Sequence, residues 1–139
     1  SSKFYIAETM AREYKDATGD VSHLISVKKT IFESRLSEPV RSTLNDGVHT
    51  VIFPPASENT KNIFMPDNII VKNGETVRWV NKDASAHIFA SMPLIGLGGI
   101  KSPTVEPEGK WEFKFEKPGE YYLICFIHNG MVGKVTVEE

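Results

Sequence analysis

The chain has 139 residues, 40% of them hydrophobic and 24% charged, which is the balance of one globular domain and excludes a disordered or fibrous protein. Sixteen Lys and Arg against eighteen Asp and Glu give a formal net charge of −2, so we expect no nucleic-acid partner. No apolar run is long enough to span a bilayer, and the single cysteine, Cys125, excludes an intramolecular disulfide and a zinc site built on paired thiolates.

The first third of the chain has a helical pattern. Residues 4–17 carry apolar side chains near the helical period and precede Thr18-Gly19, so they are predicted to form an amphipathic helix. Residues 20–46 fit either a second helix or a strand and a turn, and Pro39 ends any helix there. We therefore predict a partly helical N-terminal extension over residues 1–47. The chain begins without Met and without a charged-then-apolar leader, so we expect a processed or trimmed chain, with an anchor removed as one explanation.

From residue 48 onward, short β-branched and aromatic runs alternate with turn residues, which is typical of an antiparallel sandwich or barrel. About seven strands in this length are the number expected of a small Greek-key β-sandwich. The predicted strands are residues 48–53, 68–72, 75–81, 87–91, 110–116, 120–125 and 132–138. Asn73-Gly74 predicts a turn after the second of them. The fold class is therefore all-β, with a Greek-key sandwich domain over residues 48–139.

The aromatic residues of these strands are predicted to form the core, because they suit the inner faces of the strands. They are Trp79, Trp111, Phe113, Phe115, Tyr121 and Tyr122. Residues 92–107 are rich in Gly and Pro and predict a loop across one end of the sandwich. The apolar residues 92–100 either pack onto that end or join Phe126, Ile127 and Gly130 in an exposed patch.

Three residues in the last turn carry the most specific chemistry. Cys125, His128 and Met131 follow the spacing Cys-x2-His-x2-Met between two strands, so a thiolate, an imidazole and a thioether can face one point. Soft sulfur with imidazole selects copper, and one Cys with two His and a weak axial Met is the type 1 copper site. His87, just after a polar turn, is the predicted second histidine, with His49 as the reserve choice. The alternatives are a buried hydrophobe for Cys125, a surface histidine for His87 and core filling for Met131.

With this motif, the chain resembles the cupredoxins, the family of plastocyanin and amicyanin, over roughly residues 60–139. The resemblance is carried by Gly-Glu-Thr-Val-Arg-Trp-Val-Asn at 74–81, by Pro-Gly-Glu-Tyr-Tyr-Leu-Ile-Cys at 118–125 and by Met-Val-Gly-Lys-Val-Thr-Val at 131–137. It implies a cupredoxin-like fold and a single copper ion that cycles between Cu(I) and Cu(II). The resemblance also implies that this ion is held by the four residues His87, Cys125, His128 and Met131.

Two departures from the family pattern concern the loops that carry these residues. Ile88 and Phe126 stand where many cupredoxins carry an Asn and a Ser or Thr whose side chains tie the two loops together. Asn129 stands where plastocyanin-like loops usually carry Pro, so Asn129-Gly130 is a flexible turn pair. The sequence therefore leaves open whether Met131 or water is the axial ligand.

The resemblance implies a mononuclear type 1 copper protein that acts as a one-electron carrier, without catalytic residues, and with a redox partner that docks near His128. The alternative is a nitrosocyanin-like copper enzyme that acts on nitric oxide, nitrite or an oxygen species at a solvent-accessible copper. Copper storage is a third hypothesis, but four scattered Met residues form no cluster. Copper proteins of this family generally work outside the cytoplasm, which implies an exported, periplasmic or membrane-surface protein.

Overall fold

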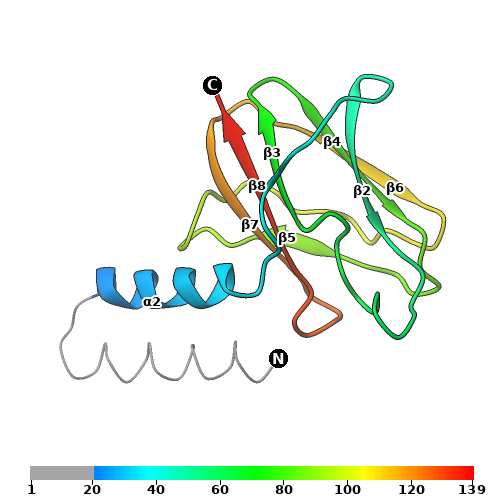
Figure 1. The fold of residues 1–139 in the computed structure, drawn as a ribbon, viewed down its shortest axis with the longest axis horizontal. Helices are drawn as coiled ribbons and strands as arrows, with labels where there is room; N and C mark the ends of the chain where they lie inside the picture. Colours follow the sequence, from blue (N-terminus) through cyan, green and yellow to red (C-terminus); the bar gives the residue numbers. More distant parts are fainter. Residues whose placement is uncertain (1–20) are drawn as a thin grey trace.

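The computed structural model describes residues 21–139, in which two β-sheets face each other (Figure 1). One sheet has five strands in the order β1-β3-β8-β7-β5, and the other has three in the order β2-β4-β6. The strands are β1 (Val40–Arg41), β2 (Val48–Phe53), β3 (Asn68–Lys72), β4 (Thr76–Asn81), β5 (Phe89–Ser91), β6 (Lys110–Lys114), β7 (Gly119–Cys125) and β8 (Val132–Glu138). The predicted β-sandwich is therefore confirmed. The helix predicted over residues 4–17 lies outside the described residues.

All seven predicted strands are present, and three of them, β2, β3 and β8, have the predicted bounds. The other four differ by one or two residues at one end. The sequence did not predict β1, because a strand of two exposed residues has no hydrophobic periodicity to detect. The boundary proposed between an extension and a sandwich domain at residue 47 stays a prediction.

The strand pairing is mixed, which differs from the antiparallel pattern that the sequence predicted. β1 with β3, β2 with β4, and β3 with β8 are parallel pairs. The reason is that the turn at Asn73-Gly74 joins β3 to β4, which belong to different sheets. The chain crosses between the layers there instead of forming a hairpin, so strands that follow one another in sequence are not always neighbours in a sheet.

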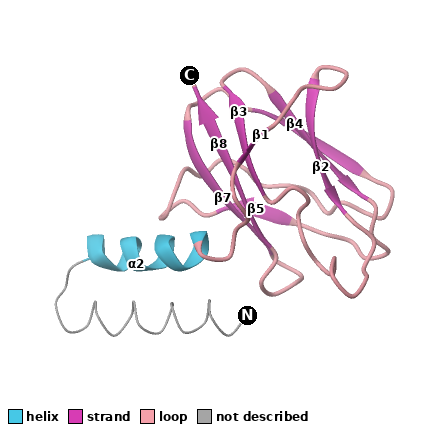
Figure 2. Cartoon of the chain, viewed as in Figure 1, coloured by secondary structure: helices cyan, strands magenta, loops and turns pink. Residues whose placement is uncertain are grey.

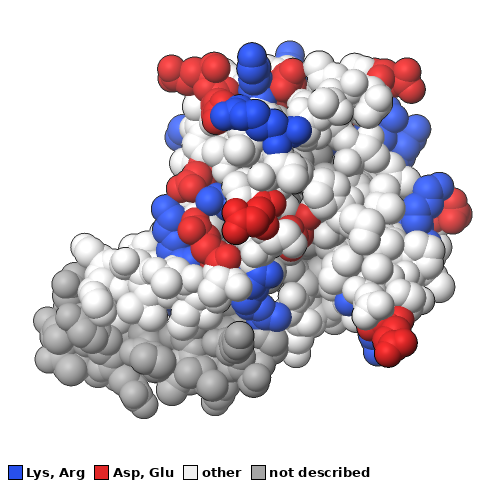
Figure 3. All heavy atoms as spheres, viewed as in Figure 1, with Lys and Arg blue, Asp and Glu red and all other residues white. Residues whose placement is uncertain are grey.

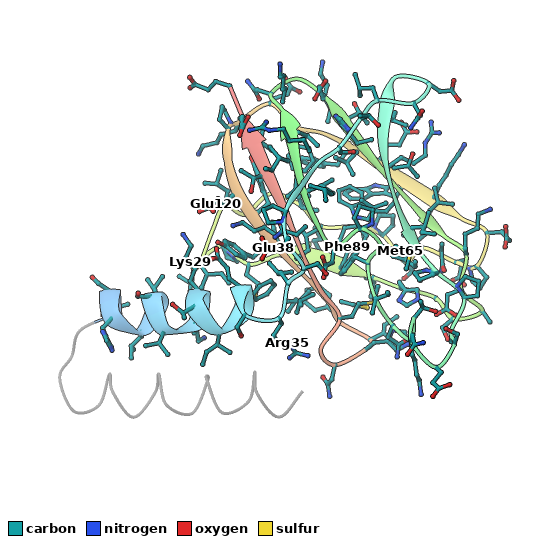
Figure 4. All side chains as sticks on the ribbon, in the orientation of Figure 1. Lys29, Arg35, Glu38, Met65, Phe89 and Glu120 are labelled. Carbon is teal, nitrogen blue, oxygen red and sulfur yellow. The ribbon has the colours of Figure 1, made fainter. Side chains whose placement is uncertain are left out.

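The hydrophobic core lies between the two sheets, and aromatic side chains dominate it. Trp79 and Phe115 are almost completely buried, as is Phe89, which Figure 4 places between the sheets. Trp111 and Phe113 pack against this core but are only partly buried, because β6 is an edge strand. Complete burial of one such side chain contributes roughly 1.5–3 kcal/mol, so these aromatic residues stabilise the packing of the two sheets.

Residues 21–33 form the helix α2 (Val21–Glu33). Of the two alternatives for residues 20–46, a second helix or a strand and a turn, the helix is therefore correct. Figure 2 shows this helix beside a body made of strands and loops. Its buried Phe32 meets the ring of Tyr122 edge to face, with 5.2 Å between the centroids. Neighbouring Tyr121 points the other way, into the core between the sheets. Because β7 is covered on both faces from Tyr121 onward, residues 121–125 are a run of aromatic and apolar side chains without alternation.

A cluster of charged side chains fastens α2 to the five-stranded sheet. Lys134, only 12% exposed, lies 3.0 Å from a carboxylate oxygen of Glu33 and 2.8 Å from one of Glu120. Lys29 of α2 lies 3.0 Å from Glu120, and Figure 4 shows these two residues next to each other. The hydroxyl of Tyr122 donates to Glu33. On the face drawn in Figure 3, acidic and basic side chains accordingly lie side by side. No helix in the described part of the chain has the length and hydropathy of a membrane span.

Candidate metal centre

Three of the four predicted metal ligands meet at one end of the sandwich. His87, Cys125 and His128 each offer one donor atom, and these atoms all lie within 4.8 Å of one another. Among the described residues, this is the one group of at least three His, Cys, Asp or Glu side chains that could share an ion. The sequence spacing explains the meeting of Cys125 and His128, which are three residues apart in a tight loop.

Sheet pairing explains how His87 reaches the other two residues. Phe89 of β5 pairs with Cys125, the last residue of β7, in an antiparallel ladder. His87 precedes β5 by two residues, and its backbone pairs with Val105 in an isolated bridge. The start of β5 and the end of β7 therefore lie at the same edge, and this brings the imidazole to the thiol.

The donor distances suit a single metal ion. The Sγ atom of Cys125 lies 3.9 Å from Nδ1 of His87 and 3.7 Å from Nδ1 of His128. For metal–nitrogen and metal–sulfur bonds of about 2.0 and 2.3 Å, a trigonal arrangement separates the two donors by about 3.7 Å. One soft thiolate and two imidazoles form the donor set that type 1 copper takes. The residues present therefore fit the metal that the sequence predicts.

Two of the three residues of the site are shielded from solvent, and the third, His128, is partly exposed. His87 is 1% exposed and Cys125 is 7% exposed, whereas His128 is half-buried. The rings of His87 and His128 lie 4.7 Å apart, and the ring of Phe53 lies 4.8 Å from His87 on the core side. The thiol is thus shielded by hydrophobic packing, and His128 is the one of the three residues that stays partly exposed.

Hydrogen bonds close the loop between β7 and β8 around the site. The N–H of Cys125 donates to the carbonyl oxygen of Met131 at 3.1 Å, and the N–H of Met131 donates to that of His128 at 3.4 Å. Gly130 has a φ of 81°, a left-handed conformation that glycine adopts without strain. Arg35, which follows α2, donates to the carbonyl oxygen of Gly130 at 3.4 Å, and Figure 4 places it beside this loop. The loop is therefore held from outside as well as from within.

Met131, the fourth predicted ligand, is 1% exposed and belongs to the same buried cluster as Cys125. This position is compatible with an axial ligand and also with the core-filling role that the sequence left as the alternative. Axial coordination by Met131 stays a prediction.

Asp83 is a residue of the site that sequence reasoning missed. One carboxylate oxygen, Oδ2, lies 3.0 Å from Nε2 of His87, and the aspartate is 5% exposed. Burial alone would raise the pKa of Asp83, but hydrogen bonds from His87 and from two backbone N–H groups hold it below its usual value. Burial lowers the pKa of His87, opposed by Asp83 and aided by His128. The Asp-x3-His spacing in a polar turn was the available signal.

The reserve prediction, in which His49 is the second histidine ligand, is wrong. It lies in β2, is 2% exposed, and its two ring nitrogens are engaged by Ser42 Oγ at 2.8 Å and Glu75 Oε1 at 2.9 Å. It does not belong to the group of donors around Cys125. Its physical role is that of a buried histidine whose polar atoms are both satisfied by neighbouring segments.

Fold and site together define a class of protein. It is a β-sandwich that holds one thiol and two imidazoles at one end, where a single metal ion fits. The sequence matches the family described as Cupredoxin-like domain over residues 10–137. The chain belongs to the cupredoxin-like family.

Individual relatives agree with this assignment. The chain is 35% identical over 69 residues to amicyanin from Paracoccus denitrificans, a match that covers 49% of this chain and 53% of the amicyanin. The chain thus spans about half the length of this curated relative. A purple cupredoxin from Nitrosopumilus maritimus has a similar structure, with a TM-score of 0.56, 28% identity, and 64% of this chain and 98% of that chain covered.

A copper-containing nitrite reductase from Thermus scotoductus also contains a similar domain, with a TM-score of 0.61 and 25% identity. The likeness covers 73% of this chain but only 28% of the reductase. The shared part is therefore the sandwich domain and not the whole enzyme.

Proposed function

We propose that this chain is a mononuclear type 1 copper protein that carries one electron at a time. The observation that supports it most is the convergence of the Cys125 thiol with Nδ1 of His87 and of His128, at 3.9 and 3.7 Å. The chain that carries these residues belongs to the cupredoxin-like family. Copper held by this donor set supplies a Cu(I)/Cu(II) couple. The proposal includes an exported location, which the family resemblance implies.

The residues of this chain would have distinct tasks in that role. Cys125 and the two histidines would hold the metal, and Met131 would be the weak axial ligand. The buried aromatic core and the closed loop restrict movement of these side chains, which lowers the reorganisation needed when the charge at the site changes. Electrons would pass through the half-buried ring of His128.

A small apolar surface next to His128 suits a transient redox partner. Phe126 and Ile127 are 59% and 52% exposed, and Leu94 is 70% exposed. Phe126 and Leu94 line the same groove, about 260 Å³ in volume, together with Ile124. Redox complexes use interfaces at the small end of the size range, because the partner must leave quickly. Within residues 92–100, Ile95 and Ile100 pack inward while Leu94 faces solvent, so the loop serves packing and is also available for docking.

The decisive experiment is an optical and electron paramagnetic resonance spectrum of the copper-loaded protein, compared with Cys125→Ser. The wild-type protein is expected to show an intense thiolate-to-copper band in the visible and a small copper hyperfine splitting. Cys125→Ser should lose the band, and Met65→Leu, which removes a sulfur atom outside the site, should keep it. A copper-loaded wild-type protein without the band would contradict the proposal.

The second candidate is a copper enzyme that acts on nitric oxide, nitrite or an oxygen species. It is favoured by the likeness to one domain of a nitrite reductase and by the half-buried position of His128. Steady-state consumption of nitrite by the reduced protein with excess electron donor separates the two functions. Turnover well beyond one equivalent per copper would establish the enzyme, and a single stoichiometric oxidation or none would favour the carrier.

A further inference from the structure

The carboxylate of Asp83 is fixed on both of its oxygens. Oδ1 accepts from the backbone N–H of Ala84 at 2.8 Å and from that of Ala56 at 3.2 Å. Oδ2 faces Nε2 of His87 at 3.0 Å. Asp83 is 5% exposed and His87 is 1% exposed, so water contributes little to this contact.

The turn that carries Asp83 is itself braced by Asn81. The side-chain oxygen of Asn81 accepts the N–H of Asp83 at 2.8 Å, and its side-chain nitrogen donates to the carbonyl oxygens of Ser85 and Val105, at 2.8 and 2.9 Å. Val105 pairs through its backbone with His87. The segments that carry the carboxylate and the imidazole are therefore joined by hydrogen bonds to the side chain of Asn81. Asn81 itself is completely buried.

We propose that Asp83 is a positioning residue that sets His87 in the tautomer with the proton on Nε2, and so leaves the lone pair of Nδ1 directed at the metal site. A carboxylate can only accept, so Nε2 has to donate across the 3.0 Å contact. In the neutral ring the other nitrogen, Nδ1, is then the acceptor, and it is the atom that lies 3.9 Å from Cys125 Sγ. The inference deepens the proposed copper function and rests on it where it concerns metal affinity.

The same geometry explains why an amide could not replace this carboxylate. Two backbone N–H groups point at the Oδ1 position, so the oxygen of an asparagine at position 83 would occupy it. The NH2 group would then face Nε2 of His87 and act as a donor. Nε2 would have to accept, the ring proton would move to Nδ1, and the lone pair needed for the metal would be lost.

His49 and Glu75 supply a matched control within the same molecule. Nε2 of His49 lies 2.9 Å from Oε1 of Glu75, and His49 is 2% exposed, so this is a second buried histidine in contact with a carboxylate. His49 does not belong to the group of donors around Cys125. Glu75→Gln therefore removes one charge from one histidine–carboxylate pair and leaves the metal site untouched.

The first measurement needs no metal. Nitrogen-15 NMR of the imidazole rings in the metal-free protein should show His87 with a protonated Nε2 in the wild type and in Glu75→Gln. Asp83→Asn should move the proton to Nδ1, and Asp83→Ala should give a mixture of both tautomers. An unchanged His87 tautomer in folded Asp83→Asn overturns the proposal. Asp83→Ala keeps the question decidable if the amide variant does not fold, because it too must lose the preference for Nε2–H.

The second measurement is copper affinity by competition with a chelator. Outer-shell partners of metal-bound histidines are worth on the order of 10- to 100-fold in affinity, so Asp83→Asn should weaken copper binding by that factor while Glu75→Gln should not change it. Equal affinities for the two variants would overturn the proposal. A wild-type protein without the thiolate-to-copper band would defeat the copper function, but the metal-free NMR result would still decide whether Asp83 sets the tautomer of His87.

Discussion

The backbone N–H of Phe126 donates a hydrogen bond to the carbonyl oxygen of Ile88, with 2.8 Å between nitrogen and oxygen. These are the two positions where many cupredoxins carry polar side chains that tie the ligand loops together. Here the ladder between β5 and β7, which pairs Phe89 with Cys125, continues for one more contact and joins the loops through the backbone. The side chain of Phe126 is therefore not needed to hold His87 against Cys125, and it is 59% exposed.

Because the tie is made by the backbone, Phe126→Ser should leave the metal site intact and affect docking. We expect an unchanged visible spectrum and an unfolding free energy within about 0.5 kcal/mol of the wild type. If two copies meet through the apolar surface proposed around His128, the electron self-exchange rate, measured by NMR line broadening in mixtures of oxidised and reduced protein, should fall. Val40→Ser is the control, because Val40 is exposed and lies in β1, the edge strand farthest from β5 in the same sheet. A similar rate in both variants would exclude Phe126 from the contact surface.

Met131→Leu tests the fourth ligand. If the thioether is the axial ligand, its replacement by a hydrocarbon should raise the reduction potential and keep the visible band, because an axial ligand tunes the potential while the thiolate gives the colour. Cyclic voltammetry and electron paramagnetic resonance measure the two properties. Met65→Leu serves as the control for a methionine outside the site. If Met131→Leu changes neither the potential nor the spectrum, Met131 only fills the core.

The charged cluster under α2 makes part of the stability depend on pH. The pKa of Glu33 lies below its ordinary value chiefly because Tyr122 donates to it, and that of Glu120 chiefly because Lys134 donates to it. A carboxyl group with a lowered pKa in the folded state stabilises the fold at pH values above its unfolded pKa. This stabilisation is lost as the pH falls through the folded pKa. The contribution should thus be complete at neutral pH and disappear on the acid side of the ordinary value of 4.5.

Glu33→Gln should remove this contribution. We expect a loss of about 1 kcal/mol in unfolding free energy at neutral pH, a modest value because the Glu33 side chain is 41% exposed. The difference from wild type should shrink as the pH falls through the acid range. Urea unfolding of the metal-free protein at several pH values measures it, with Glu58→Gln, an exposed loop residue, as the control. A constant difference across the pH series would mean that charge on Glu33 is not its source.

The sequence predicted the sandwich and most of the site for identifiable reasons. Cys125 and His128 are close in the chain, so a tight turn is enough to bring them together. His87 was chosen because it follows a polar turn, from where the end of a neighbouring strand in a sandwich can reach the loop of Cys125, and β5 does pair with β7. β2, β3 and β8 were found because each has a clear apolar pattern.

The missed features depend on contacts between segments that no local pattern encodes. Asp83 lies in a polar turn where an acidic residue is ordinarily solvated, and only the fold shows that backbone N–H groups of Ala84 and Ala56 enclose it. His49 was the reserve ligand because it lies in a predicted strand, but as a buried histidine it has polar partners of its own. Those partners, Ser42 and Glu75, come from separate segments and could not be identified from the sequence.

Ser42→Ala tests the structural role assigned to His49. The variant leaves Nδ1 of a ring that is 2% exposed without its partner at 2.8 Å, and an unsatisfied buried polar atom costs about 1–3 kcal/mol. Urea unfolding should show a loss in this range, whereas Ser57→Ala, which removes an exposed hydroxyl, should be near neutral. The copper spectrum of Ser42→Ala should match that of the wild type, because His49 lies outside the donor group. A changed spectrum would mean that the Ser42–His49–Glu75 contacts and the metal centre are coupled through the sandwich, since β2 carries both His49 and Phe53, whose ring packs on His87.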